Sequence, residues 1–114
     1  MLSAYDLQAD GSVRNMRVFH NFSPGRSADG LAIDTQGNVY AAAGLNFLRG
    51  TSETLDTKCG VYVFSPKGQQ LRFIPVPEDL LTNVAFGGPD MKTLYITSGK
   101  SLFRVRVDVA GTRR

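Results

Sequence analysis

The strongest constraint on the fold is an internal repeat of short strand–turn–strand units. One unit starts at Asp29, and its apolar runs Leu31–Ile33 and Val39–Ala43 flank the turn-forming residues 34–38. A second unit with the same order spans Thr82–Thr97. Because both units have short apolar runs separated by Gly, Asn, Asp or Pro, they predict β-hairpins. The chain therefore repeats a hairpin.

The remaining apolar segments form a second pair of related hairpins. Leu2–Leu7 meets the turn Asp10-Gly11 before Met16–Phe19 resumes an alternating pattern. Val61–Phe64 and Leu71–Ile74 flank a Ser-Pro-Lys-Gly turn in the same way. With Gly 12 and Pro 5 interrupting short apolar runs, we expect an all-β chain with little or no helix.

Four antiparallel strands that recur every ~40 to 50 residues are the unit of a β-propeller blade. We assign residues 1–22 to the third and fourth strands of one blade, 27–76 to a full blade, and 81–109 to the first three strands of a further blade, the last running over Leu102–Val109. The fold class is therefore a partial β-propeller of just over two blades of four-stranded antiparallel sheet, in a single domain over residues 1–114.

Blades bury their faces against neighbouring blades, so two blades alone would leave apolar sheet in water. Either the sequence is a piece of a longer propeller, or copies associate to close a ring. Three copies would supply about six blades, although the duplicated third strand makes simple closure awkward; two copies joined by edge pairing or strand exchange are the alternative.

Residues 45–58 interrupt the full blade and have no counterpart in the second hairpin unit, where only Ser98-Gly99-Lys100 occurs. This segment lacks both the helical and the strand period. It predicts a long surface loop, either one that covers a site or one without a function.

Composition excludes several classes of function. The net charge is +3, but Arg104 and Arg106 alternate with apolar residues, which favours the solvent face of an edge strand over a nucleic-acid groove. No apolar run approaches the ~20 residues of a membrane span, and no signal-peptide pattern opens the sequence. We therefore expect a soluble chain, and the sequence does not indicate its cellular compartment. Cys59 is the only cysteine, a thiol expected to be buried or half-buried. His20 is the only histidine and has no nucleophile motif near it, so we expect a strand residue.

The sequence resembles the SMP-30/gluconolactonase/LRE-like family from about Val18 to Val109. The segments that carry the resemblance are Ala28–Asp34, Gly37–Tyr40, Gly60–Pro66, Ile74–Pro77, Thr82–Gly88 and Thr93–Thr97, and bacterial gluconolactonase-type members also have a loop similar to Thr51–Thr57. The Asp-Gly and Thr-Asn-x-x-Phe-Gly-Gly elements in this order are fairly specific together, though each is weak alone.

The resemblance implies a six-bladed propeller with one divalent cation, calcium or zinc, at the mouth of the central channel, and hydrolysis of lactones and related esters. Asp29 matches the metal-ligating aspartate of the family. Such a cation polarises the lactone carbonyl, and Asp29 would ligate it and accept a proton from water. Members usually also supply a glutamate near the start of the propeller and an asparagine from an earlier blade, and this sequence contains neither blade.

Two further residues are candidates for the same site. Thr82 and Asn83 occupy the position of Asp29 in the next blade, so they would hydrogen-bond the groups around the cation or satisfy backbone groups at the strand start. Without the resemblance, an Asp before a strand is most often a turn or loop cap, and Asp34 is better interpreted as a turn residue.

Two functions remain open from the sequence. The first is a metal-dependent lactone hydrolase, with Asp29 as catalytic and metal-ligating residue, a small-molecule lactone as substrate, and activity upon homo-oligomeric completion of the ring. The second is a non-catalytic propeller fragment that acts as a structural or binding scaffold. The sequence supports neither a nucleic-acid nor a membrane partner.

Overall fold

The computed structural model describes residues 1–48, 50 and 53–113. Within them the chain is all β, as predicted, and no helix is long and apolar enough to cross a membrane. The strands in chain order are β1 (Leu2–Leu7), β2 (Val13–His20), β3 (Leu31–Ile33), β4 (Val39–Ala43), β5 (Gly60–Phe64), β6 (Gln70–Pro75), β7 (Asn83–Gly87), β8 (Thr93–Thr97) and β9 (Leu102–Arg106).

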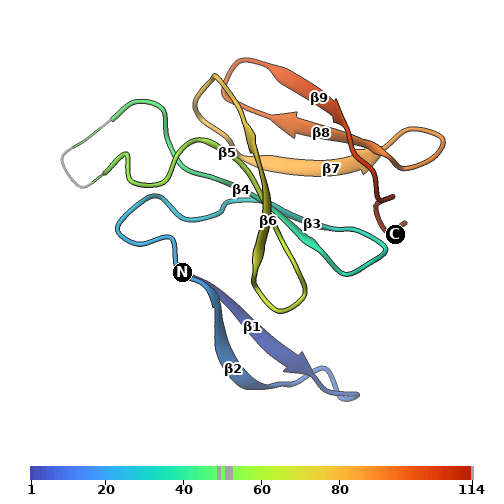
Figure 1. Cartoon of the computed structure of the whole chain (residues 1–114). Helices are drawn as coiled ribbons and strands as arrows, with labels where there is room; N and C mark the ends of the chain where they lie inside the picture. The colour runs from blue at the N-terminus through green and yellow to red at the C-terminus, as the bar shows by residue number, and fades with distance from the viewer. Residues whose placement is uncertain (49, 51–52, 114) are drawn as a thin grey trace.

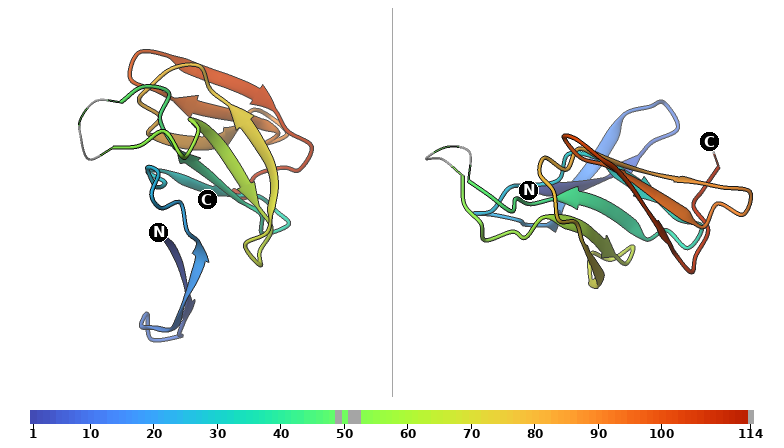
Figure 2. Two further views of the ribbon diagram at one scale, coloured as in Figure 1. Left: turned by 60° about the vertical axis from the view of Figure 1, so that its left-hand side comes forward. Right: turned by 90° about the horizontal axis from the view of Figure 1, so that it is seen from above.

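The described strands form three antiparallel sheets, each made of strands consecutive in the chain. Their orders are β1-β2, β3-β4-β5-β6 and β7-β8-β9. Figure 1 shows the four-stranded sheet between the other two, with the β1–β2 hairpin at one end and β7–β9 at the other. Seen from two further directions, the β1–β2 hairpin extends away from the rest of the chain (Figure 2). Both predicted hairpins of the repeat are confirmed, as β3–β4 and β7–β8.

The turn between β3 and β4 follows from Asp34 and Gly37. The buried Asp34 carboxylate accepts the backbone N–H groups of Gln36 and Asn38, each at 2.9 Å, as an Asx-type turn requires. Gly37 has a φ of 81°, which a residue with a Cβ adopts only at a cost. The interpretation of Asp34 as a turn residue is therefore correct.

Strand β4 is buried on both faces because a sheet packs on either side of it. Tyr40 and Ala42 point to the core shared with β7–β9, whereas Ala41 and Ala43 point to the core shared with β1–β2. Across the first of these cores the Tyr40 and Phe86 rings meet edge to face, with centroids 4.9 Å apart. The run of apolar residues in β4 thus marks the central sheet.

The contact between β1–β2 and the central sheet is aromatic. Phe19 meets Phe64 at a centroid distance of 5.8 Å, and His20 lies 4.6 Å from the same ring. Most of β1–β2 beyond this contact is exposed, including Leu7 at 76% and Met16 at 59% of their full area. His20 is a strand residue, as expected.

The last strand differs from its predicted range. β9 ends at Arg106 rather than Val109, because the chain turns there and Val107 is buried, with its N–H bonded to Lys92 O. The following residues cross to the central sheet, where the Thr112 N–H and hydroxyl both donate to Ile33 O. Arg104 and Arg106 are exposed on β9, an edge strand among the described residues, which confirms their interpretation.

Candidate functional site

Asp29 lies two residues before β3, the first strand of the central sheet and the strand nearest the next sheet, here called its inner strand. Its backbone N–H donates to Ala42 O at 2.9 Å, and Gly30 O accepts from Ala42 N, so the β3–β4 ladder continues through both residues. This pairing fixes the backbone while leaving the side chain 41% exposed. Asp29 is therefore a rigidly placed carboxylate at the end of a strand.

Arg26 forms an ion pair with this carboxylate. Its Nη2 contacts Asp29 Oδ2 at 2.5 Å, and its Nη1 donates to the backbone carbonyl of Leu81 at 3.3 Å. The Arg26 side chain is only 18% exposed, so the pair is better shielded from water than an ordinary surface ion pair. Asp29 Oδ1 makes no hydrogen bond to any residue of the described part of the chain.

Thr82 and Asn83 begin the inner strand of the next sheet, close to Asp29 in space. Asn83 packs against Gly30, where a Cβ would overlap the Asn83 side chain. Its Oδ1 accepts the N–H of Val84 at 2.9 Å, and the Thr82 hydroxyl lies 2.9 Å from that of Thr97. Among the described residues, the Thr82 and Asn83 side chains bond to groups of β7 and β8 at the start of the strand, and neither bonds to Asp29.

A hollow of about 550 Å³ lies between the inner strands of the two sheets. It is lined by Leu31, Ala32, Ile33, Asn83, Val84, Ala85, Phe86, Met91 and Thr112. Asn83 belongs both to this hollow and to the strand start beside Gly30. The hollow thus runs along β3 and β7, from Asn83 to Met91 and Thr112, and Asp29 is not among its lining residues.

The loop 45–58 is attached to the chain on both sides of the site, although its residues 49, 51 and 52 lie outside the described ones. On one side, the Thr54 and Thr57 hydroxyls donate to Pro24 O and Phe22 O at 3.1 and 3.0 Å. On the other side, the Asp79 carboxylate accepts the N–H groups of Asn46 and Phe47 at 2.8 and 2.9 Å. The loop therefore connects the segment before Asp29 to the segment before Thr82.

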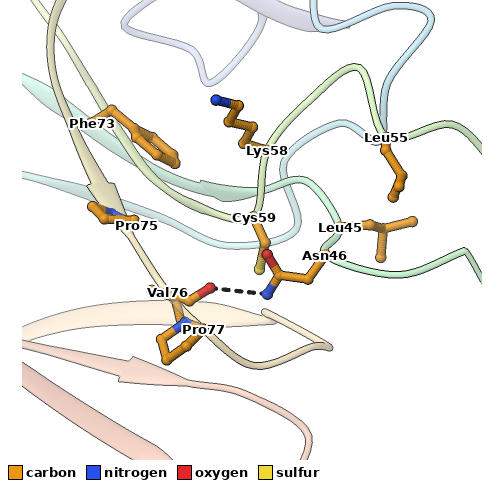
Figure 3. Close-up of a pocket in the computed structure, with 9 residues that line it drawn as sticks. All are labelled: Leu45, Asn46, Leu55, Lys58, Cys59, Phe73, Pro75, Val76 and Pro77. Carbon is orange, nitrogen blue, oxygen red and sulfur yellow. Dashed lines mark hydrogen bonds between the residues drawn. The ribbon is translucent and has the colours of Figure 1, made fainter.

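A second cavity of about 510 Å³ lies beneath this loop (Figure 3). Asn46 donates its side-chain amide to Val76 O at 3.0 Å in its wall, and Cys59 lies at its centre. Burial raises the pKa of the Cys59 thiol to about 11, with a smaller contribution from Asp79. Cys59 is thus the buried thiol that its isolation in the sequence predicted.

Asp29 belongs to no ready-made cluster of metal-binding side chains among the described residues. In residues 1–48, 50 and 53–113 there is no group of three His, Cys, Asp or Glu side chains that could hold a metal ion. Calcium takes six to eight oxygen ligands and zinc four ligands, whereas this end of β3 offers one carboxylate.

Sequence reasoning missed two residues of this region. Arg26 and Asp79 both lie outside the ranges assigned to blades. Arg26 pairs with Asp29, three residues away, and also bonds to Leu81, whereas Asp79 bonds to Asn46, 33 residues away. The Arg-x-x-Asp spacing was the one local signal for the Arg26 pair.

Consecutive antiparallel sheets, each packed face to face on the next, define the chain as a β-propeller segment with a carboxylate at the start of an inner strand. The profile of the SMP-30/Gluconolactonase/LRE-like region matches residues 1–100. The chain belongs to this family, as the sequence resemblance predicted.

Individual relatives agree with this assignment. The chain is 35% identical over 104 residues to the 6-deoxy-6-sulfogluconolactonase of Pseudomonas putida, covering 88% of this chain and 31% of that protein. It is 30% identical over 94 residues to the regucalcin of Danio rerio, covering 82% of this chain and 28% of the relative. The chain thus spans about a third of the length of these relatives.

Solved structures show the same architecture. The structure of a putative gluconolactonase superposes with a TM-score of 0.75 at 29% identity, covering 98% of this chain and 33% of that one. A luciferin-regenerating enzyme superposes with a TM-score of 0.75 at 26% identity, covering 96% of this chain and 39% of that one. The partial propeller predicted from the sequence is confirmed by both.

Proposed function

We propose that the chain provides part of the active site of a lactone hydrolase, with Asp29 as its acid–base carboxylate. The observation that carries the proposal is the placement of Asp29: its backbone is fixed by the β3–β4 ladder and one carboxylate oxygen is held by Arg26. The other oxygen has no hydrogen-bond partner among the described residues. Relatives named as lactonases support the reaction class.

Hydrolysis of a lactone requires a nucleophilic water and a polarised carbonyl. Asp29 Oδ1 is free to accept a proton from a water held near it, which is the general-base role. A divalent cation, calcium or zinc, would polarise the carbonyl and acidify the water when bound. Asp29 is the ligand this chain would contribute, and the remaining oxygens would come from other blades or from a second copy.

Self-association is the second part of the proposal. The exposed apolar side chains of β1–β2 include Leu7, Val13 and Met16, and the edge of β9 carries exposed Leu102. Exposed apolar sheet and free strand edges favour pairing with another copy. A dimer or trimer would bring further inner strands to the mouth and add the ligands that one copy lacks.

A non-catalytic scaffold is the alternative function. Its specific support is that Arg26 already balances the charge of Asp29, and that Asp29 belongs to no group of three or more His, Cys, Asp or Glu side chains in the described part of the chain. On this view the ion pair and the inner-strand hollow are structural, and the chain contributes blades without a reaction.

The test compares Asp29→Asn with wild type in a lactonase assay on a sugar-acid lactone, with and without calcium or zinc. We expect kcat to fall by about 10²-fold or more, because an amide cannot accept the proton. Asp56→Asn, an exposed carboxylate in the loop, is the matched control and should leave kcat unchanged.

Light scattering on the same samples gives the native mass. Turnover that survives Asp29→Asn, or a wild type that is inactive in every oligomeric state, would refute the hydrolase proposal and favour the scaffold. A monomer at all concentrations would refute self-association.

A further inference from the structure

The residues around Arg26 form a chain of contacts that ends at the Asp29 carboxylate. It begins in the loop, where the Thr57 hydroxyl donates to Phe22 O at 3.0 Å. Thr57 also packs directly on Gly25, where a Cβ would overlap the Thr57 side chain and backbone. Because Gly25 precedes Arg26, this packing fixes the backbone from which the Arg26 side chain extends.

Arg26 then makes two contacts with different strand starts. Its Nη2 holds Asp29, two residues before β3, and its Nη1 holds Leu81 O, two residues before β7. The planar guanidinium presents its donors in a fixed geometry, so both bonds together define where the carboxylate lies. A lysine at this position would offer one charged centre instead of a two-sided fork.

The two oxygens of the Asp29 carboxylate differ in their contacts. Oδ2 is engaged by Arg26, while Oδ1 has no hydrogen-bond partner among the described residues. A carboxylate that binds a cation or a reacting water is commonly held by a hydrogen bond on its other oxygen, and loss of that bond costs about 10- to 100-fold in affinity or activity. Arg26 occupies the corresponding position beside Asp29.

We propose that Arg26 is a positioning residue of the site: it orients Asp29 against the start of β7, and the Thr57 contact on Gly25 holds it in place. This inference rests on the proposed hydrolase function. It also gives Thr57, at the end of the loop 45–58, a role, since Thr57 supports the backbone next to Arg26.

The kinetic test compares Arg26→Met and Arg26→Lys with wild type. Arg26→Met should lower kcat by about 10- to 100-fold with KM changed less than threefold, because the acid–base group is displaced while substrate contacts remain. Arg26→Lys should recover part of the loss, since it restores one charged contact. Arg106→Met, which removes the exposed ion pair with Asp90, is the matched control and should leave both parameters unchanged.

A second readout is independent of turnover. In NMR spectra, the Arg26 guanidinium signals should shift in Asp29→Asn and in Thr57→Val, and Arg106→Met should leave them in place. Thr57→Val keeps the side-chain shape and removes only the hydroxyl, so its effect reports the support from the loop.

The outcomes separate the two proposals. Arg26 guanidinium chemical shifts that are unchanged in Asp29→Asn would overturn the Arg26–Asp29 contact itself, whatever the activity. An active wild type whose kinetics respond to Arg26→Met no more than to Arg106→Met would overturn the positioning role and leave the hydrolase intact. An inactive wild type with the NMR contact present would overturn the hydrolase and reduce Arg26 to a structural ion pair.

Discussion

The Asp79 carboxylate accepts the backbone N–H of Asn46 at 2.8 Å, across 33 residues of sequence. Its second oxygen accepts the N–H of Phe47, so one side chain satisfies two consecutive amides at the start of the loop. This joint holds the loop to the connection between β6 and β7, opposite the Thr57 attachment.

Replacement of Asp79 should therefore loosen the loop. Asp79→Asn keeps the size but replaces one acceptor oxygen by an NH2 donor, so one of the two amides loses its acceptor and the other keeps only a neutral one. We expect the free energy of unfolding to fall by about 1–3 kcal/mol. Urea unfolding followed by fluorescence or circular dichroism measures it. Asp56→Asn is the control, and an equal loss in both variants would show that Asp79 has no special role.

Gly25 should not tolerate a larger side chain. In Gly25→Ala the Cβ overlaps Thr57, so either the loop or the Arg26 segment must move, at a cost of about 1–3 kcal/mol in unfolding free energy. Gly50→Ala has open space around its Cβ and should change stability by less than about 0.5 kcal/mol. Thermal melts measure the melting temperatures of the two variants. Equal melting temperatures would contradict the close contact between Gly25 and Thr57.

Cys59 should be unreactive in the folded chain. Its side chain is buried and its thiol pKa is raised to about 11, so little thiolate is present at pH 8. A thiol reagent such as DTNB should react slowly with the native chain and rapidly after unfolding in urea. Because the folded pKa exceeds the ordinary value of 9.0, the contribution of this thiol to stability is complete below pH 9 and is lost as the pH rises toward 11. Rapid labelling of the native chain would contradict the buried position.

Asp90 provides a pH-dependent contact at the other end of the molecule. The Arg106 hydrogen bonds and the Lys92 N–H lower the pKa of the Asp90 carboxyl to about 2. Since the folded pKa lies below the ordinary 3.8, the stabilisation is present above pH 4 and is lost as the pH falls toward 2. An NMR titration of the carboxyl should show its midpoint moving upward in Arg106→Met, and an unchanged midpoint would refute the pairing.

The sequence was sufficient for the parts of the structure that depend on local pattern. The Asp34–Asn38 turn and the apolar run of β4 involve neighbours in the chain, so the hairpins and the all-β class could be predicted. The Arg26 contact with Leu81 spans 55 residues and the Asp79 contact with Asn46 spans 33, and no residue period encodes either. The predicted end of β9 at Val109 was wrong for a related reason: Val107 bonds to Lys92 and Thr112 to Ile33, so the chain leaves the strand after Arg106.

The bond from Thr112 to Ile33 joins residues that are 79 positions apart. During synthesis, every strand from β4 to β9 must leave the ribosome before this joint can close. Within each sheet every strand after the first pairs with the strand before it in the chain, so the sheets can assemble one by one as the chain emerges. The Ile33 carbonyl lacks both Thr112 donors throughout that interval, so its contact with the C-terminal segment forms only after β9 has been made.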